Sequence, residues 1–214
     1  MSMSEAIWSS TKVAGVLLLI SALIPIGGTL ALVVATGYRP AVGASIQDLE
    51  RIAGEVTAHR WALGFWVVGY LAALAGFGVL TSLLQGSNPR AISSTALIGF
   101  TIVFMFVALE ATFHMSVTTW AAEKTTLDPV VPSFYEPLHL WVSMAIQPIY
   151  LVLGLIAIAG YGWAFLRTEL VPDLAGWASL GWCALWIAIS ALSRATIPGV
   201  LLIISSVIGI ALLL

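Results

Sequence analysis

Residues 94–121 read STALIGFTIVFMFVALEATFHMSVTTWA, an unbroken apolar run that carries one carboxylate, Glu110, and one imidazole, His114. As an α-helix this run measures about 42 Å, which exceeds the hydrocarbon core of a bilayer, about 30 Å thick. A helix is the expected form because a segment in lipid must satisfy its backbone hydrogen bonds internally. The stretch therefore predicts a membrane-spanning helix with a polar site inside it.

Runs of this kind occur six times along the chain, each long enough to cross a bilayer. We expect an all-α fold, a polytopic integral membrane helical bundle that forms a single transmembrane domain over residues 1–214. The six spans are expected at about 13–35, 61–84, 94–121, 138–166, 174–192 and 196–214. Ser193, Arg194 and Ala195 join the last two, which should form an antiparallel hairpin.

The composition agrees with a membrane protein. Apolar residues make up 60% of the chain and charged residues only 8%, against about 25% charged residues in soluble domains. A soluble enzyme, a nucleic-acid binder and a disordered protein are excluded, because so few charges cannot solvate the surface that such proteins expose. The lipid bilayer is the expected partner. Six of the eight basic residues are Arg and the chain is rich in Ala, Gly and Trp, a composition typical of a GC-rich bacterial genome, and we expect a multi-pass protein of the bacterial cytoplasmic membrane.

Of the three connections between the first four spans, the first and the last are long, and we call these two the first and the second connection. In the first, Ser45 has the form of an N-cap, and apolar residues then recur at helical spacing from Ile46 to Val56, with Arg51 and Glu55 placed to pair. This pattern predicts a short amphipathic helix on the membrane surface, which either forms a lid over the bundle or has a gating or partner-docking role. The second connection, 123–137, contains three prolines and should be non-helical.

Glu110 is the one acidic or basic side chain deep in any predicted span, and His114 lies four residues later on the same helix face. Counted from the predicted end of its span, Glu110 lies about 16 Å below the interface. An unpaired carboxylate at this depth costs several kcal/mol, so it must be protonated or held by a partner. Such a residue marks a candidate functional site.

The predicted topology brings further polar residues to the same half of the membrane. His139, Ser143 and Gln147 recur at intervals of four and form one stripe on the fourth span. The second span begins at the same face with His59 and Arg60. We therefore predict a ligand- or proton-binding site formed by Glu110, His114, His139, Ser143, Gln147, His59 and Arg60.

Several functions fit this cluster. It could fix helix register through interhelical hydrogen bonds, which would suit an accessory or scaffolding subunit of a larger membrane complex. It could line a pocket for a proton-linked or small-ligand binding or transport function. It could hold haem or a metal, although no His or Cys signature indicates one and the cofactor stays unknown. An enzyme is less expected, because no Asp lies in any span and only Ser116 or Ser143 could act as a nucleophile.

Small residues recur at intervals of four in two of the spans. They form Gly69–Ala73 and Ala72–Gly76 pairs in the second span and a Ser205–Gly209 pair in the sixth. Such pairs let helix backbones approach closely, and we expect them to serve packing within one chain. Pro25 should bend the first span.

Three short motifs resemble a family of uncharacterised bacterial membrane proteins defined as a domain of unknown function. They are Lys12-Val13-Ala14-Gly15 at the first span, Ala58-His59-Arg60-Trp61-Ala62-Leu63-Gly64 at the second, and Leu170-Val171-Pro172 leading to Leu174-Ala175-Gly176-Trp177 at the fifth. The resemblance covers nearly the whole chain. It implies a six-helix fold and carries no activity, so it assigns no functional residues.

Overall fold

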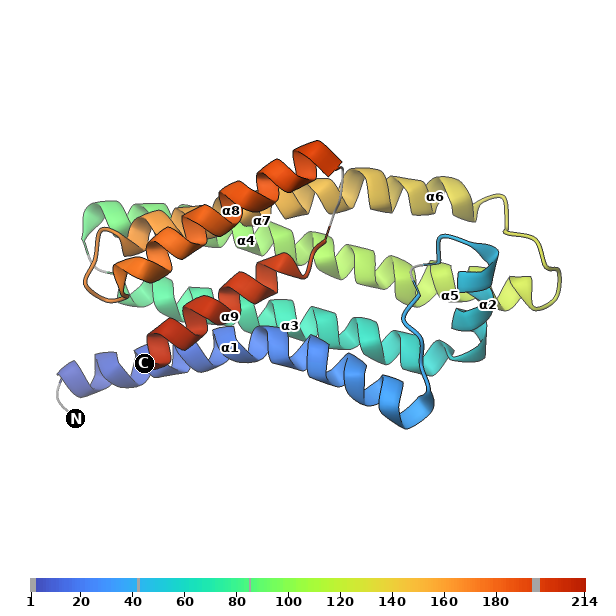
Figure 1. Cartoon of the computed structure of the whole chain (residues 1–214), viewed down its shortest axis with the longest axis horizontal. Coiled ribbons are helices and arrows are strands. Elements are labelled where there is room, and N and C mark those ends of the chain that lie inside the picture. Colours follow the sequence, from blue (N-terminus) through green and yellow to red (C-terminus); the bar gives the residue numbers. More distant parts are fainter. Residues whose placement is uncertain (1–2, 42, 85, 194–196) are drawn as a thin grey trace.

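The computed structural model describes residues 3–41, 43–84, 86–193 and 197–214, and this part of the chain folds as helices joined by loops (Figure 1). Five helical segments are long and apolar enough to cross a membrane, which indicates a multi-pass membrane protein. The elements are α1 (Met3–Thr36), α2 (Ile46–Gly54), α3 (Val56–Leu83), α4 (Ser87–Phe113), η1 (His114–Thr118), α5 (Thr119–Thr125), α6 (Tyr135–Trp141), η2 (Val142–Ile146), α7 (Gln147–Phe165), α8 (Asp173–Ser193) and α9 (Val200–Leu213).

Two pairs of α-helices continue into each other through π-helical turns. The segment η1 joins α4 to α5, and η2 joins α6 to α7, so each set forms one long rod. The α4–η1–α5 rod contains the predicted span 94–121 and extends past both of its ends. The α6–η2–α7 rod begins before the predicted span 138–166 and ends one residue short of it. The second connection is non-helical only over 126–134, because Pro137 falls in the first turn of α6, where a missing N–H is tolerated.

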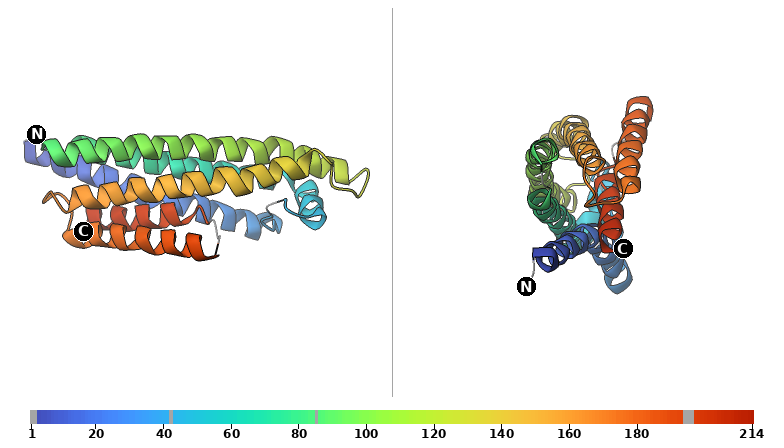
Figure 2. Two further views of the ribbon diagram at one scale, coloured as in Figure 1. Left: turned by 90° about the horizontal axis from the view of Figure 1, so that it is seen from above. Right: turned by 90° about the vertical axis from the view of Figure 1, so that its left-hand side faces the viewer.

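The helices pack in an order that differs from their order in the chain. The first helix α1 packs on α3 and α9, α4 packs on α3 and α7, and α7 packs on α8. Seen along the bundle, α9 lies on the side between α1 and the α7–α8 pair (Figure 2). In the centre, Phe77 stacks on Tyr161 and meets Phe100 edge to face, and all three rings are fully buried.

The small-residue pairs serve packing inside the chain, as predicted. At the crossing of α9 with α1, a Cβ on Gly209 would lie 2.7 Å from the Gly15 carbonyl oxygen and from the Leu19 nitrogen. At the crossing of α3 with α1, Gly69 faces the Ser21 carbonyl oxygen. Pro25 has no N–H, so that carbonyl lacks its usual hydrogen bond from residue i+4. Gly69 packs on α1 at this interruption of the helical hydrogen bonds.

The sixth predicted span is not confirmed. The helix α9 has 14 residues and is about 21 Å long, which is less than the hydrocarbon core. It runs back towards the end of the bundle that holds the N-terminus, as a hairpin partner of α8 would, but it packs mainly on α1 (Figure 1). The predicted connection falls largely on residues 194–196, which lie outside the described residues.

The short amphipathic helix predicted in the first connection is present as α2. The Ser45 hydroxyl accepts a hydrogen bond from the Asp48 N–H at 3.2 Å, as an N-cap should. Arg51 pairs with Asp48 at 3.8 Å and not with Glu55. The apolar face of α2 packs on α5 and not on lipid, because Leu49 and Ile52 are buried in a cluster with α5 residues. This helix therefore covers one end of the bundle.

The Gly209 crossing gives a first prediction. Replacing Gly209 with Val forces α9 away from the α1 backbone, and we expect overpacking to cost about 1–3 kcal/mol. A matched control is Gly181→Ala, because a Cβ on Gly181 meets nothing within 4 Å. Thermal unfolding in detergent should show a lower midpoint for Gly209→Val alone. Equal midpoints for the two variants would contradict the α1–α9 packing.

Candidate functional site

A cavity of about 930 Å³ lies at the end of the bundle that α2 covers. Its walls come from α3, α4 with η1, and the α6–η2–α7 rod, and the loop before α9 lines its inner end. We call it the polar cavity because its lining includes His59, Glu110, His114, Glu136, His139, Ser143 and Gln147. It therefore contains six of the seven predicted site residues.

The short length of α9 accounts for this space. Tyr70 on α3 donates a hydrogen bond to the Pro198 carbonyl at 2.7 Å, and Gly199 lies against the Trp66 ring. On the other side, Leu201 of α9 lies against Gly154 of α7. The helix thus bridges α3 and α7 from Gly199 towards the C-terminus. Beyond Pro198, in the direction away from α9, none of the described helices fills the space between α3 and the α6–η2–α7 rod, and this space is the polar cavity.

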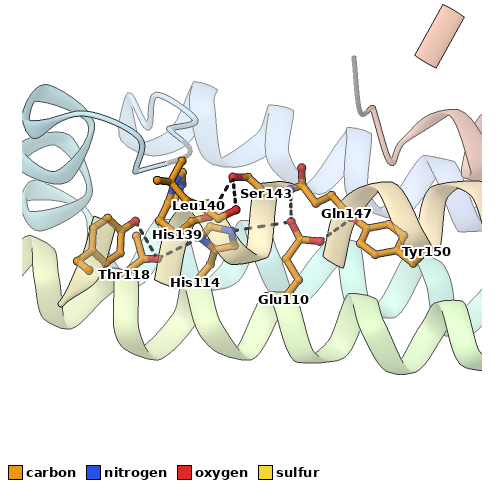
Figure 3. Close-up of polar contacts among 9 residues, drawn as sticks. Glu110, His114, Thr118, His139, Leu140, Ser143, Gln147 and Tyr150 are labelled. Carbon is orange, nitrogen blue, oxygen red and sulfur yellow. Dashed lines mark hydrogen bonds and ion pairs between the residues drawn. The ribbon is translucent and has the colours of Figure 1, made fainter. Parts of the chain in front are cut away.

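Glu110 on α4 is held by two donors from the facing rod. Gln147 donates from Nε2 to Glu110 Oε1, and the Tyr150 hydroxyl donates to Oε2 at 2.6 Å (Figure 3). The two donors are three residues apart, so they share one face of α7. Both carboxylate oxygens therefore receive a hydrogen bond from a neutral side chain, which offsets part of the cost of burying this group.

A row of polar groups continues from Glu110 towards the covered end (Figure 3). His114 Nε2 lies 3.9 Å from Glu110 Oε1, and His114 Nδ1 lies 3.1 Å from the Thr118 hydroxyl. Tyr135 donates to Thr118 at 3.3 Å. If the Thr118 hydroxyl donates its hydrogen bond to Nδ1, neutral His114 carries its hydrogen on Nε2, towards Glu110. We call Tyr135, Thr118, His114 and Glu110 the polar row.

The two π-helical segments lie beside this row. His114 begins η1, and η2 contains Ser143 and precedes Gln147 directly. Each π turn shifts the helix register by one residue, and such turns occur frequently at functional sites. The sequence gives no signal for these turns, because no residue pattern identifies the i→i+5 hydrogen bonds of a π-helix.

His59 lies in the opposite wall, on α3, and is 2% exposed. Its Nδ1 is 3.1 Å from the hydroxyl of Tyr38, a residue in the first connection. Burial raises the pKa of Tyr38 to about 12, so its hydroxyl keeps a proton at neutral pH. Among the described residues, His59 Nε2 has no hydrogen-bond partner. The first connection is therefore tied to the cavity wall through a histidine with a second, unsatisfied nitrogen.

The remaining predicted residues have different surroundings. His139 lies across from His114, with 6.1 Å between ring centroids, and the Ser143 hydroxyl donates to the His139 carbonyl of its own helix. Arg60 does not line the polar cavity. Its guanidinium donates to the Met115 carbonyl and to Thr119, both at 3.1 Å, and so ties α3 to the α4–α5 rod.

Aromatic residues of the cavity were missed by the sequence analysis. Tyr150, Tyr70 and Trp66 all line it, and the first two supply hydrogen bonds that shape it. Tyr150 could have been found, because it follows Gln147 by three residues and so shares its helix face. No sequence pattern marks Tyr70 and Trp66 as cavity residues, since their place in the lining depends on where α9 begins.

The charge of the lining restricts the chemistry of the site. None of the residues that line the polar cavity is Lys or Arg, whereas two are carboxylic acids. Within the part of the chain that the structure describes, no three His, Cys, Asp or Glu side chains are grouped as metal ligands would be. The lining is thus suited to neutral or cationic groups and to proton exchange.

Comparison of the chain with protein-family models, curated proteins and solved structures gives no match in any of the three. The resemblance drawn from the three short motifs therefore stays a prediction. What the chain does has to be argued from the polar cavity.

The contacts of Glu110 give a second prediction. Replacing Tyr150 with Phe removes one of the two donors to the carboxylate, and we expect a loss of about 1–3 kcal/mol in stability. Tyr161→Phe is the matched control, because that hydroxyl bonds Thr81 at 2.7 Å and does not line the cavity. Thermal unfolding should show a lower midpoint for both variants. An unchanged midpoint for Tyr150→Phe would contradict the hydrogen bond.

Proposed function

We propose that this protein binds a small ligand in the polar cavity and couples the binding to a proton at Glu110. The setting we propose is the bacterial cytoplasmic membrane. The observation that carries the proposal is the position of Glu110, whose carboxylate lies at a cavity of about 930 Å³ among apolar helices. A cluster that only fixed helix register would gain nothing from an adjoining space large enough for a ligand.

The depth of Glu110 supports a function inside the membrane. Trp163 and Trp141 are both exposed and lie 22 residues apart on one rod, about 33 Å, which matches the spacing of two interfacial aromatic belts. Gln147, which bonds Glu110, lies about 9 Å inside the belt at Trp141. A charged residue within the hydrocarbon region is costly, and such residues commonly mark ligand or proton pathways.

The polar row supports the link to protons. Tyr135 and Thr118 bring hydroxyl groups from the covered end of the cavity to His114, and His114 faces Glu110. The gap of 3.9 Å between His114 Nε2 and Glu110 Oε1 exceeds a hydrogen bond, and a small side-chain rotation would close it. When His114 takes up a proton at Nδ1 from the Thr118 side, its Nε2 can pass its own hydrogen to the Glu110 carboxylate as the ligand occupies or leaves the site.

The third prediction tests Glu110 directly. Glu110→Gln keeps the shape of the side chain and removes the proton that it can release. We expect the wild-type chain, purified in mild detergent, to retain a small molecule that mass spectrometry can identify, and the variant to retain at least tenfold less. Adding that molecule back to the wild-type protein should change the pH of a weakly buffered solution, whereas Glu110→Gln should give no change.

Tyr161→Phe is the control for lost stability, because it weakens the core without touching the polar cavity. Equal retention by the wild type and Glu110→Gln would refute the proposal. That result, together with a stoichiometric protein partner in the preparation, would favour an accessory subunit in which the cluster is architectural.

A further inference from the structure

His59 carries a buried polar atom that the polar row does not use. Its Nε2 has no hydrogen-bond partner among the described residues, although the side chain is 98% inaccessible and lines the polar cavity. An unsatisfied buried group of this kind is destabilising, because it has lost its hydrogen bonds to water and gained none in return. In a cavity wall, it indicates a position where a ligand supplies the missing partner.

The hydrogen bond at Nδ1 determines whether His59 Nε2 needs a donor or an acceptor as its partner. We assign the Tyr38 hydroxyl as the donor to His59 Nδ1, 3.1 Å away, because the described part of the chain offers that hydroxyl no other acceptor. Neutral His59 then carries its own hydrogen on Nε2. The unsatisfied nitrogen is therefore a donor. It is buried in the cavity wall, so a ligand that reaches it after a small rotation of the ring must offer an acceptor there.

The rest of the lining describes the ligand's body and charge. Leu63, Trp66, Val107 and Leu140 give the cavity mostly apolar walls. Glu110 and Glu136 lie in the lining without any Lys or Arg, so an anionic head such as a fatty-acid carboxylate is disfavoured. An uncharged molecule with an apolar body and an oxygen acceptor fits both features.

The cavity also reaches the outer surface of the bundle. Leu140 and Met144 line it and are nevertheless 46% and 73% exposed, on a rod that would face lipid. At the opposite end the first connection covers it, since Gly43 lies so close to Tyr135 that a Cβ there would meet the Tyr135 hydroxyl. A ligand would therefore reach the cavity sideways from the bilayer.

We propose that the ligand is a neutral amphiphile dissolved in the membrane, whose carbonyl oxygen accepts a hydrogen bond from His59 Nε2 while its apolar body lies along Trp66, Leu140 and Met144. The proposal rests on the function proposed for the same cavity. Carbonyl groups of this kind occur in membrane quinones and in acyl esters, so both sources are included in the test.

The fourth prediction uses three probes of similar apolar character. Decylubiquinone represents quinones, monoolein represents acyl esters, and tetradecane has no acceptor. The full chain in detergent is incubated with each probe and passed through a sizing column, and the retained probe is counted per chain. We expect at least one carbonyl probe to be retained, and His59→Phe to reduce its affinity about tenfold. Retention of tetradecane should not depend on His59.

Tyr38→Phe serves as a second variant that leaves His59 in place and removes the donor that sets its tautomer. We expect it to weaken binding of the same probe, which keeps the test decisive if His59→Phe does not fold. The proposal is overturned if the wild type retains neither carbonyl probe, or if the folded His59 and Tyr38 variants retain them as the wild type does. A ligand that still depends on Glu110 in that case would leave the proposed function intact.

Discussion

The length of α9 is the constraint on which the functional end of this protein depends. A helix of 14 residues fills the space between α3 and α7 along only part of the bundle, and it begins just after Pro198, whose carbonyl accepts a hydrogen bond from Tyr70. The remaining space cannot close by itself, because α3 and the α6–η2–α7 rod are each fixed against other helices. The polar cavity is the part of the bundle that the last helix does not reach.

Two sets of polar contacts lie on facing walls of this cavity. Glu110, tied to Gln147 and Tyr150, marks its inner part, and the polar row leads from there to Tyr135 under the covered end. On the facing wall, Tyr38 joins the first connection to His59. In the proposed function, proton exchange and ligand contact lie on different walls, which would let the protonation of one affect occupancy at the other.

Much of this arrangement could be predicted from local sequence. Long apolar runs predicted the helices, Ser45 predicted the start of α2, and intervals of four placed Gln147 opposite Glu110. The sequence could not show where α9 packs or how far it extends, because its uniformly apolar residues suit any neighbour. It also could not show that Arg60 turns towards Met115, or that Tyr38 reaches His59 across 21 residues, since both contacts depend on the tertiary fold.

The most direct test of the ligand cavity is an electron cryomicroscopy map of the full chain in lipid nanodiscs prepared without detergent. We expect density for a non-protein molecule between α3 and η2, in contact with both Glu110 and His59. The cavity would be refuted by a map in which side chains of α3 and α6 meet across that space and leave no room for a ligand.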